Sequence, residues 1–245
     1  MITDNVNLIS IKKILFHEKN ENERTLKIKN SLIESKVLRT PLMAVSLVND
    51  SYMLIDGANR AHALIELGFQ YLPVFVLSEN DLKVDTWAHQ LKSIETIKNY
   101  IEKDDRLMMD NQKCSRYIAK IYFENKPYII KFSNSCEYNV KNIISIWHDL
   151  VILYKGKSIR RLERDSNETK IVYPELTINQ INEMTLQGIK IPTGITRFKS
   201  KTGRILNIDI PLYLINDDSR KEFDNYMEQV GHSLRLYEES VYILE

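Results

Sequence analysis

Residues 54–77, LIDGANRAHALIELGFQYLPVFVL, limit the fold of this chain more narrowly than any other stretch of its sequence. An apolar run ends in Asp56-Gly57, and residues 58–68 then have the pattern of a short helix that a glycine closes. Residues 72–77 follow at once as an apolar strand. A strand, a tight turn, a helix and a second strand within so few residues indicate a compact α/β module.

The turn in this segment has the chemistry of an anion site. A glycine lets the backbone approach a ligand closely, and the free N–H groups at a helix N-terminus bind anions. Arg60, one turn into the predicted helix, adds a group that can grip a phosphate with two hydrogen bonds. Asp56 offers the oxygen ligands that magnesium prefers. The same residues also fit a helix cap, a turn glycine and a solvated arginine, so residue types alone leave both interpretations open.

The rest of the chain predicts a mixed α+β continuation, and a weak boundary near residues 80–110 suggests domains at 1–80 and 81–245. In the first part, residues 8–16, 41–48 and 51–55 read as strands and residues 23–36 as a helix. In the second part, helices are expected over 86–103, 138–154, 178–186 and 217–236. A hairpin is expected within 116–132, and strands over 189–198 and 205–210. The expected fold class is therefore α/β with an α+β C-terminal part.

Composition narrows the class of protein further. Hydrophobic residues make up 43% of the 245 residues and charged residues 27%, which excludes a wholly disordered chain. The 34 Lys and Arg against 33 Asp and Glu give a net charge of +1, which does not point to nucleic acid. No apolar stretch approaches the length that a membrane span needs, and no signal peptide is evident. We therefore expect a cytoplasmic protein without a membrane partner, whose Cys114 and Cys136 are reduced thiols.

The sequence lacks the signature motifs of two common kinase classes. The sequence has no GxxxxGK[ST] loop, and it lacks the glycine-rich loop and HRD motif of the protein kinases. A sulfiredoxin would need its reactive cysteine beside the phosphate-binding turn, and neither cysteine lies there.

The segment around Asp56-Gly57 resembles the phosphate-binding turn of the ParB/sulfiredoxin superfamily. Further blocks resemble the free L-serine kinases of that superfamily, in the same order along the chain. They are His17-Glu18, Arg39-Thr40-Pro41, Thr86-Trp87 with His89, and the stretch at 191–215. The resemblance implies a ParB/sulfiredoxin-like N-terminal module and the transfer of a phosphoryl group from ATP or ADP to L-serine. It further implies that Mg²⁺ takes part and that the product supplies a pathway such as siderophore assembly.

The resemblance also implies roles at the phosphate end. Glu18 would be the catalytic base, although its charged surroundings equally suit a surface glutamate. Asp56 would orient the hydroxyl or hold magnesium. The nucleotide would be bound by Gly57, Ala58, Asn59 and Arg60, with Thr40 as a further contact. Asn59 stands where these kinases usually have histidine, and asparagine cannot titrate near neutral pH.

At the amino-acid end, the resemblance implies that Thr196 and Arg197 bind the serine carboxylate, because a guanidinium group fits a carboxylate geometrically. Trp87 and His89 would line the pocket. Trp87 fits a core aromatic and His89 a solvated helix residue equally well.

The alternative to an enzyme is a DNA-binding regulator that uses the ParB-like module as a nucleotide-gated switch. It would need a basic helix-turn-helix after residue 80. The strongest basic cluster is KGKSIRRLER at 155–164, which is also typical of a solvated surface. The sequence does not settle serine against threonine, the phosphate donor or the oligomeric state.

Overall fold

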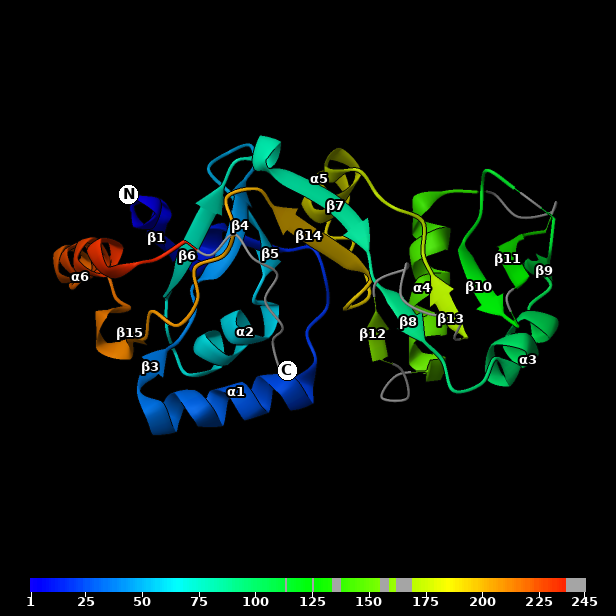
Figure 1. Ribbon diagram of the computed structural model, residues 1–245, viewed down its shortest axis with the longest axis horizontal. Coiled ribbons are helices and arrows are strands. Elements are labelled where there is room, and N and C mark those ends of the chain that lie inside the picture. Colours follow the sequence, from blue (N-terminus) through cyan, green and yellow to red (C-terminus); the bar gives the residue numbers. More distant parts are fainter. Residues whose placement is uncertain (113, 125, 134–137, 155–158, 162–168, 237–245) are drawn as a thin grey trace.

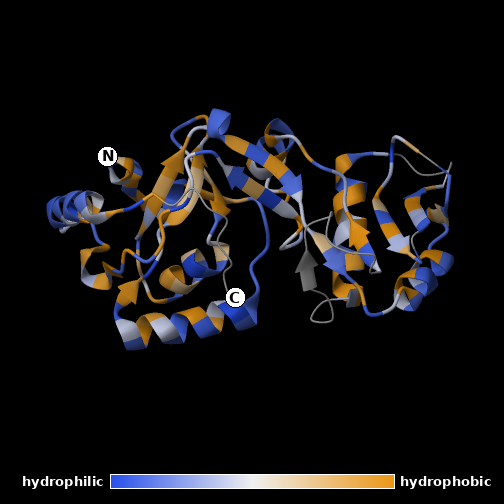
Figure 2. Cartoon of the chain, in the orientation of Figure 1, coloured by the Kyte–Doolittle hydropathy of each residue, from blue (hydrophilic) through white to orange (hydrophobic). Residues whose placement is uncertain are grey.

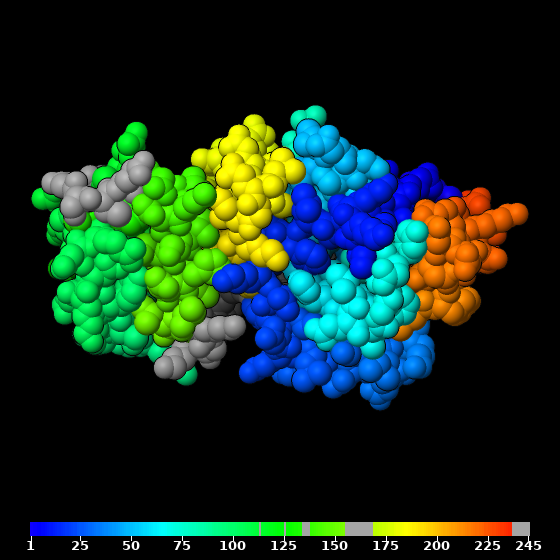
Figure 3. All heavy atoms as spheres, turned by 180° about the vertical axis from the view of Figure 1, so that it is seen from behind, coloured from blue at the N-terminus to red at the C-terminus, as the bar shows by residue number. Residues whose placement is uncertain are grey.

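The computed structural model describes residues 1–112, 114–124, 126–133, 138–154, 159–161 and 169–236. These residues form two lobes joined by a two-stranded antiparallel ribbon of β7 (Leu82–Thr86) and β14 (Thr196–Ser200), as Figure 1 shows. Seen from behind in Figure 3, α5 (Ile178–Leu186) and its flanking residues, in yellow, lie between the lobes. No helix among the described residues is long and apolar enough to cross a membrane.

The first lobe is built on a five-stranded sheet in the order β1-β6-β4-β5-β2. Its strands are β1 (Val6–Ser10), β2 (Ile14–Phe16), β4 (Leu42–Ser46), β5 (Tyr52–Asp56) and β6 (Tyr71–Leu77). Apolar residues dominate these strands in Figure 2, and Ala44, Val45, Met53 and Phe75 are fully buried. The helices α1 (Asn22–Ser35) and α2 (Ala58–Glu66) pack against each other beside this sheet.

The second lobe is built on a six-stranded sheet in the order β12-β8-β13-β10-β11-β9. Its strands are β8 (Ala88–Gln90), β9 (Leu107–Asp110), β10 (Ala119–Phe123), β11 (Lys126–Phe132), β12 (Ile159–Arg161) and β13 (Lys170–Val172). The helices α3 (Glu95–Lys103) and α4 (Val140–Tyr154) belong to the same lobe. Trp147 of α4 is fully buried, and its indole N–H donates to the Ile118 carbonyl at 2.8 Å.

The lobes do not follow the boundary expected near residue 80. After β14 the chain returns to the first lobe, where β15 (Ile210–Pro211) pairs with β3 (Val37–Leu38). The last helix, α6 (Arg220–Ser233), packs against the N-terminal turn Ile2–Asn5. The C-terminal residues therefore complete the first lobe, and the chain crosses between the lobes twice.

The expected mixed α/β class is confirmed, and most helices lie where the sequence predicts them. The predicted helix over 86–103 is wrong in its first half. Residues 88–90 form the strand β8, and α3 begins only at Glu95. The predicted strand over 8–16 is interrupted by a 3₁₀ turn at Ile11–Lys13, and the strands predicted over 189–198 and 205–210 shrink to β14 and β15.

Candidate active site

Two parallel strands end side by side in the first lobe and place the predicted catalytic residues together. Phe16, the last residue of β2, pairs with Leu54 of β5. Glu18 and Asp56 each lie two residues beyond that pair, so both fall at the same edge of the sheet, the one where the carboxyl ends of β2 and β5 lie. The antiparallel strand β4 begins at this edge, directly after Thr40-Pro41. Three of the segments that the sequence singles out therefore meet here.

Glu18 is held by a segment that comes from far along the chain. Residues 17–19 pair with Ile191, whose N–H donates to the His17 carbonyl at 2.8 Å. The N–H of Gly194 donates to Oε2 of Glu18 at 3.2 Å. The Glu18 side chain keeps 20% of its surface exposed, so its carboxylate is fixed and still accessible.

The turn at Gly57 has the geometry of an anion site. Gly57 has φ of +92°, a left-handed conformation that favours glycine, and it precedes the first residue of α2. Among the described residues, no side chain caps this helix start. The N–H groups of Ala58, Asn59 and Arg60 are therefore left for another acceptor.

Arg60 binds the protein's own oxygen atoms. Its guanidinium donates to the carbonyls of Thr40 at 2.7 Å and Pro41 at 3.1 Å, and to Oδ2 of Asp56 at 2.7 Å. Burial lowers the pKa of Arg60, and the neighbouring Asp56 opposes that shift. Arg60 thus connects the start of β4 with the end of β5. Its positive charge is already paired with the carboxylate of Asp56 before any ligand binds.

Asp56 forms ion pairs with two arginines, Arg60 and Arg204. Arg204 lies 3.3 Å from the same Oδ2 that Arg60 contacts, and it comes from the segment after β14. A charged residue beside a turn is usually solvated, so the sequence alone does not indicate this contact of Arg204. Its contact arises only because the C-terminal part of the chain returns to the first lobe.

The side-chain oxygen of Asn59 is bound to the start of α1. Its Oδ1 accepts from the Glu21 N–H at 2.8 Å and from the Thr25 hydroxyl at 3.1 Å. Asn59 therefore caps the N-terminus of α1, where Glu21 provides no cap of its own. The Oδ1 atom of Asn59 is therefore engaged within the protein, and the donors that Asn59 could offer to a phosphate are its N–H groups.

We expect Asn59→Ala to lower the free energy of unfolding by about 1–2 kcal/mol, because two partly buried donors lose their acceptor. Asn59→Asp keeps an acceptor oxygen and should stay within about 0.5 kcal/mol of the parent chain. Urea unfolding followed by circular dichroism measures both changes. Equal stability of the alanine variant and the parent chain would contradict the capping role.

Thr196 and Arg197, the residues predicted to bind the serine carboxylate, have side chains on opposite faces of β14. Successive residues of a strand face opposite ways, and β14 follows this rule. Thr196 is buried, and its hydroxyl lies 3.1 Å from Nε2 of His17. Arg197 instead lies over the Trp87 ring at 4.8 Å, and its guanidinium contacts Asp85 at 3.4 Å. Thr196 and Arg197 therefore contact different residues on opposite sides of β14.

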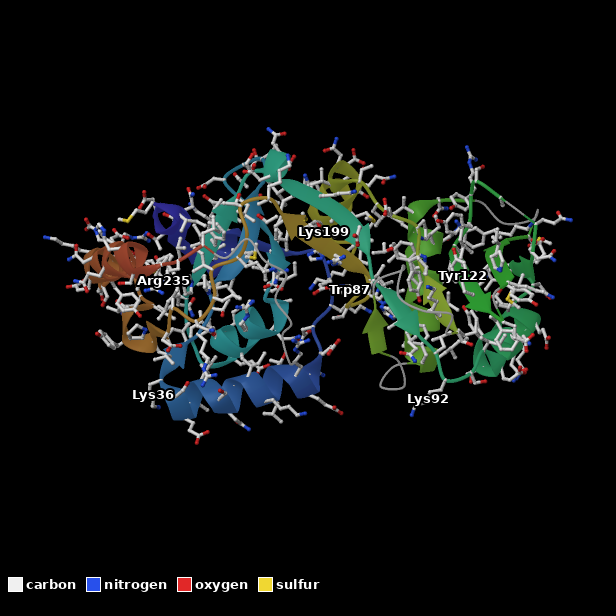
Figure 4. The ribbon with its side chains drawn as sticks, in the orientation of Figure 1. Lys36, Trp87, Lys92, Tyr122, Lys199 and Arg235 are labelled. Carbon is white, nitrogen blue, oxygen red and sulfur yellow. The ribbon has the colours of Figure 1, made fainter. Side chains whose placement is uncertain are left out.

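Trp87 and His89 differ from each other in their surroundings. Trp87 is half-buried and lies where the two lobes meet, at the end of β7, as Figure 4 shows. His89 is only 3% exposed in β8, and its Nε2 lies 2.8 Å from the Gly194 carbonyl. His89 therefore holds the carbonyl of Gly194, the residue whose N–H donates to Glu18, and it is not the solvated helix residue that the sequence also allowed.

Several features expected from the sequence lie partly outside the described residues. The thiol of Cys114 is free, and Cys136 lies outside them. Most of the basic cluster at 155–164 lies outside them as well. Within the described part of the chain after residue 80, three strands separate α3 from α4, so these successive helices do not form a helix-turn-helix.

Comparison with known proteins places this geometry in context. No family model matches the chain. The ATP-dependent L-serine kinase SbnI of Staphylococcus aureus is 25% identical over 100% of this chain and 98% of its own length. The ATP-dependent L-serine kinase of Staphylothermus marinus is 26% identical over 68% of this chain and 72% of its own.

Solved structures of proteins with similar names also resemble this chain in fold. C-terminally truncated SbnI from Staphylococcus aureus superposes with a TM-score of 0.81 at 23% identity, covering 95% of this chain and 98% of that one. A free serine kinase in complex with AMP superposes with a TM-score of 0.69 at 17% identity, covering 86% and 93%. The chain is therefore a relative of the ATP-dependent L-serine kinases and shares their fold.

Proposed function

We propose that the chain is a free L-serine kinase, which transfers a phosphoryl group from ATP (or ADP) to the serine hydroxyl and releases O-phospho-L-serine. One observation carries the proposal: Glu18 and the Asp56-Gly57 turn lie at the same edge of one sheet. A base for a hydroxyl and a cradle for phosphates are thereby neighbours. The two relatives named ATP-dependent L-serine kinases support the same reaction.

In the proposed reaction, Glu18 accepts the proton of the serine hydroxyl. The hydroxyl oxygen forms a bond to the terminal phosphorus of the nucleotide, and the bond from that phosphorus to the bridging oxygen breaks. The shortened nucleotide leaves with the electron pair. Serine's hydroxyl is a weak nucleophile, so positioning and charge neutralisation provide most of the rate enhancement.

The nucleotide phosphates would be bound by the N–H groups at the start of α2. Gly57 allows their close approach, and the helix dipole adds partial positive charge there. Thr40, at the same edge of the sheet, would be a further nucleotide contact. A structure of a free serine kinase with bound AMP and one of a variant with bound ADP support nucleotide binding by this fold.

Magnesium fits this site only together with the nucleotide. No group of three or more His, Cys, Asp or Glu in the described part of the chain could hold a metal ion by itself. Asp56 offers Oδ1, since its Oδ2 contacts two arginines. Magnesium is commonly bound by one carboxylate and the substrate phosphates, and it then neutralises phosphate charge. Asp56 is the residue that we propose for this contact.

On the substrate side, we propose that Arg197 binds the serine carboxylate. Its guanidinium carbon lies 4.8 Å from the centre of the Trp87 ring, and its side chain is 24% exposed. Trp87 would form a wall of the pocket. His89 would act through the Gly194 peptide, as its burial and its contact with the Gly194 carbonyl indicate.

The proposal is tested by incubating the purified chain with ATP or ADP and Mg²⁺ and following phosphoserine by phosphorus NMR. Reactions with L-serine, with L-threonine and with no amino acid run in parallel. We expect phosphoserine to accumulate only with L-serine and at least one donor. Nucleotide turnover that does not depend on any amino acid, or no turnover with either donor, would overturn the kinase assignment.

A further inference from the structure

Residues 190–194 run from α5 toward β14, between the two lobes in Figure 3, and we call them the connecting segment. The N–H of Ile191 donates to the His17 carbonyl at 2.8 Å, and the Ile191 carbonyl accepts from the Lys19 N–H at 3.1 Å. The last residue of the segment, a glycine, donates from its N–H to Oε2 of Glu18 at 3.2 Å. The connecting segment therefore binds the backbone on both sides of the proposed base as well as its carboxylate.

Two histidines of the second lobe bind the two ends of the connecting segment. Nε2 of His89, in β8, lies 2.8 Å from the carbonyl oxygen of Gly194. Nε2 of His148, in α4, lies 2.9 Å from the carbonyl oxygen of Lys190. Because a carbonyl oxygen can only accept, each Nε2 atom donates its proton, and it can do so from a neutral or a charged ring. The ends of the segment are thus bound to the second lobe and its middle to the first.

Lys190 contacts both lobes. Its carbonyl accepts from His148, and its ammonium group lies 5.6 Å from the centre of the Phe16 ring, within the range of a cation–π attraction. Phe16 is the last residue of β2, and His17 and Glu18 follow it directly. A change in the position of Lys190 would therefore displace the backbone that leads to Glu18.

The position of the base matters because proton transfer needs hydrogen-bond contact. A general base has to lie within about 3 Å of the atom whose proton it takes. A misplacement of about 1 Å by a change far from the chemistry can lower a rate about a hundredfold. The Glu18 side chain is 20% exposed, and one of the hydrogen bonds that fix its carboxylate comes from the connecting segment.

We infer that His148 is a positioning residue for the catalytic base. By holding the Lys190 carbonyl, it fixes the end of the connecting segment that follows α5, and the second lobe thereby determines where Glu18 lies in the first lobe. His148 acts through the segment and not on the substrate. The inference rests on the proposed serine kinase function and adds a residue to which that function assigns no role.

Substitution of His148 tests the inference in steady-state kinetics. His148→Leu should lower kcat for phosphoserine formation about tenfold, while KM for L-serine and the affinity for nucleotide change less than about twofold. His148→Gln keeps a side-chain N–H donor and should recover most of the lost rate. The matched control is His232→Leu, at an exposed position in the last turn of α6, which should keep the parental kcat. A parental kcat for His148→Leu overturns the inference.

A double variant shows whether the loss arises through Glu18. If His148 only positions the base, His148→Leu should cause no further loss of kcat once Glu18→Gln has removed that base. Losses that multiply in the double variant overturn the inference, because His148→Leu would then act on the fold in general.

Hydrogen–deuterium exchange followed by mass spectrometry tests the contact between the lobes without any assay of activity. In His148→Leu, peptides that cover residues 189–195 should exchange faster, because the N–H groups of Ile191 and Gly194 are donors to the first lobe. Peptides that cover α2 should exchange as in the parent chain. Unchanged exchange over 189–195 overturns the inference while the kinase function stands. Faster exchange there, in a chain that never phosphorylates serine, overturns the proposed function instead.

Discussion

Glu18→Gln should lower kcat for phosphoserine formation by about a hundred- to ten-thousandfold, the usual contribution of a general base. Glutamine keeps the size of the side chain and an oxygen that can accept from the Gly194 N–H, which lies 3.2 Å from Oε2. It cannot accept the hydroxyl proton. The loss should therefore appear in kcat, with KM for L-serine and the affinity for nucleotide changed much less.

The matched control for this variant is Glu23→Gln, which removes an equal charge from an exposed position in the first turn of α1. We expect this control to retain parental activity. Coupled detection of phosphoserine over a range of L-serine concentrations separates kcat from KM for both variants. If Glu18→Gln kept parental kcat, another group would have to be the base, and the kinase assignment itself would remain.

The second large effect is expected at Gly57. An added Cβ would lie 2.6 Å from Cδ2 of Leu42 and 2.9 Å from a guanidinium nitrogen of Arg60, so the turn would have to shift. The left-handed backbone with φ of +92° adds about 1–2 kcal/mol of strain, and overpacking of this kind costs about a further 1–3 kcal/mol. Gly57→Ala should also weaken nucleotide binding, because the N–H groups that face the phosphates move with the turn.

Gly68→Ala separates the cost of backbone strain from the cost of overpacking by the added Cβ. Gly68 has the same φ of +92°, and no atom lies within 4 Å of an added Cβ there. This variant should lose only about 1–2 kcal/mol of stability, from backbone strain alone. Urea unfolding and titration with a fluorescent nucleotide provide both readouts. Equal destabilisation of the two variants with unchanged nucleotide affinity would show that the close approach at Gly57 has no role.

The turn at the start of α2 could be predicted because it is local in sequence. Asp56, Gly57 and the start of α2 are consecutive, and the residue types alone indicate a strand, a left-handed glycine and a helix start. The role of Asn59 could not be predicted in this way. Its side chain caps α1, a helix that begins 37 residues earlier at Asn22, and no pattern in the sequence links the two positions.

The residues around Trp87 show why the structure of the segment 86–103 was harder to predict from the sequence. Apolar spacing over 86–103 fits a helix, but pairing with distant strands overrides it. His89 of β8 is paired with Ile171 of β13, and Thr86 of β7 with Thr196 of β14. Local periodicity cannot report partners that are 80 or more residues away. The contacts of His17 could not be predicted for a similar reason, because its partners at Leu54 and Thr196 become neighbours only in the folded chain.

By itself, the sequence determined the α/β class and indicated the strand, the glycine turn and the helix start around Gly57, because each depends on a short run of residues. The role of Glu18 as the base is implied by the resemblance to the free L-serine kinases and stays a prediction. Only the tertiary structure shows which neighbours the remaining residues have, because those neighbours lie far away in the sequence. Thr196 and Arg197 are adjacent in sequence and look like one binding group. Because successive residues of a strand face opposite ways, Thr196 contacts His17 and Arg197 lies over the ring of Trp87.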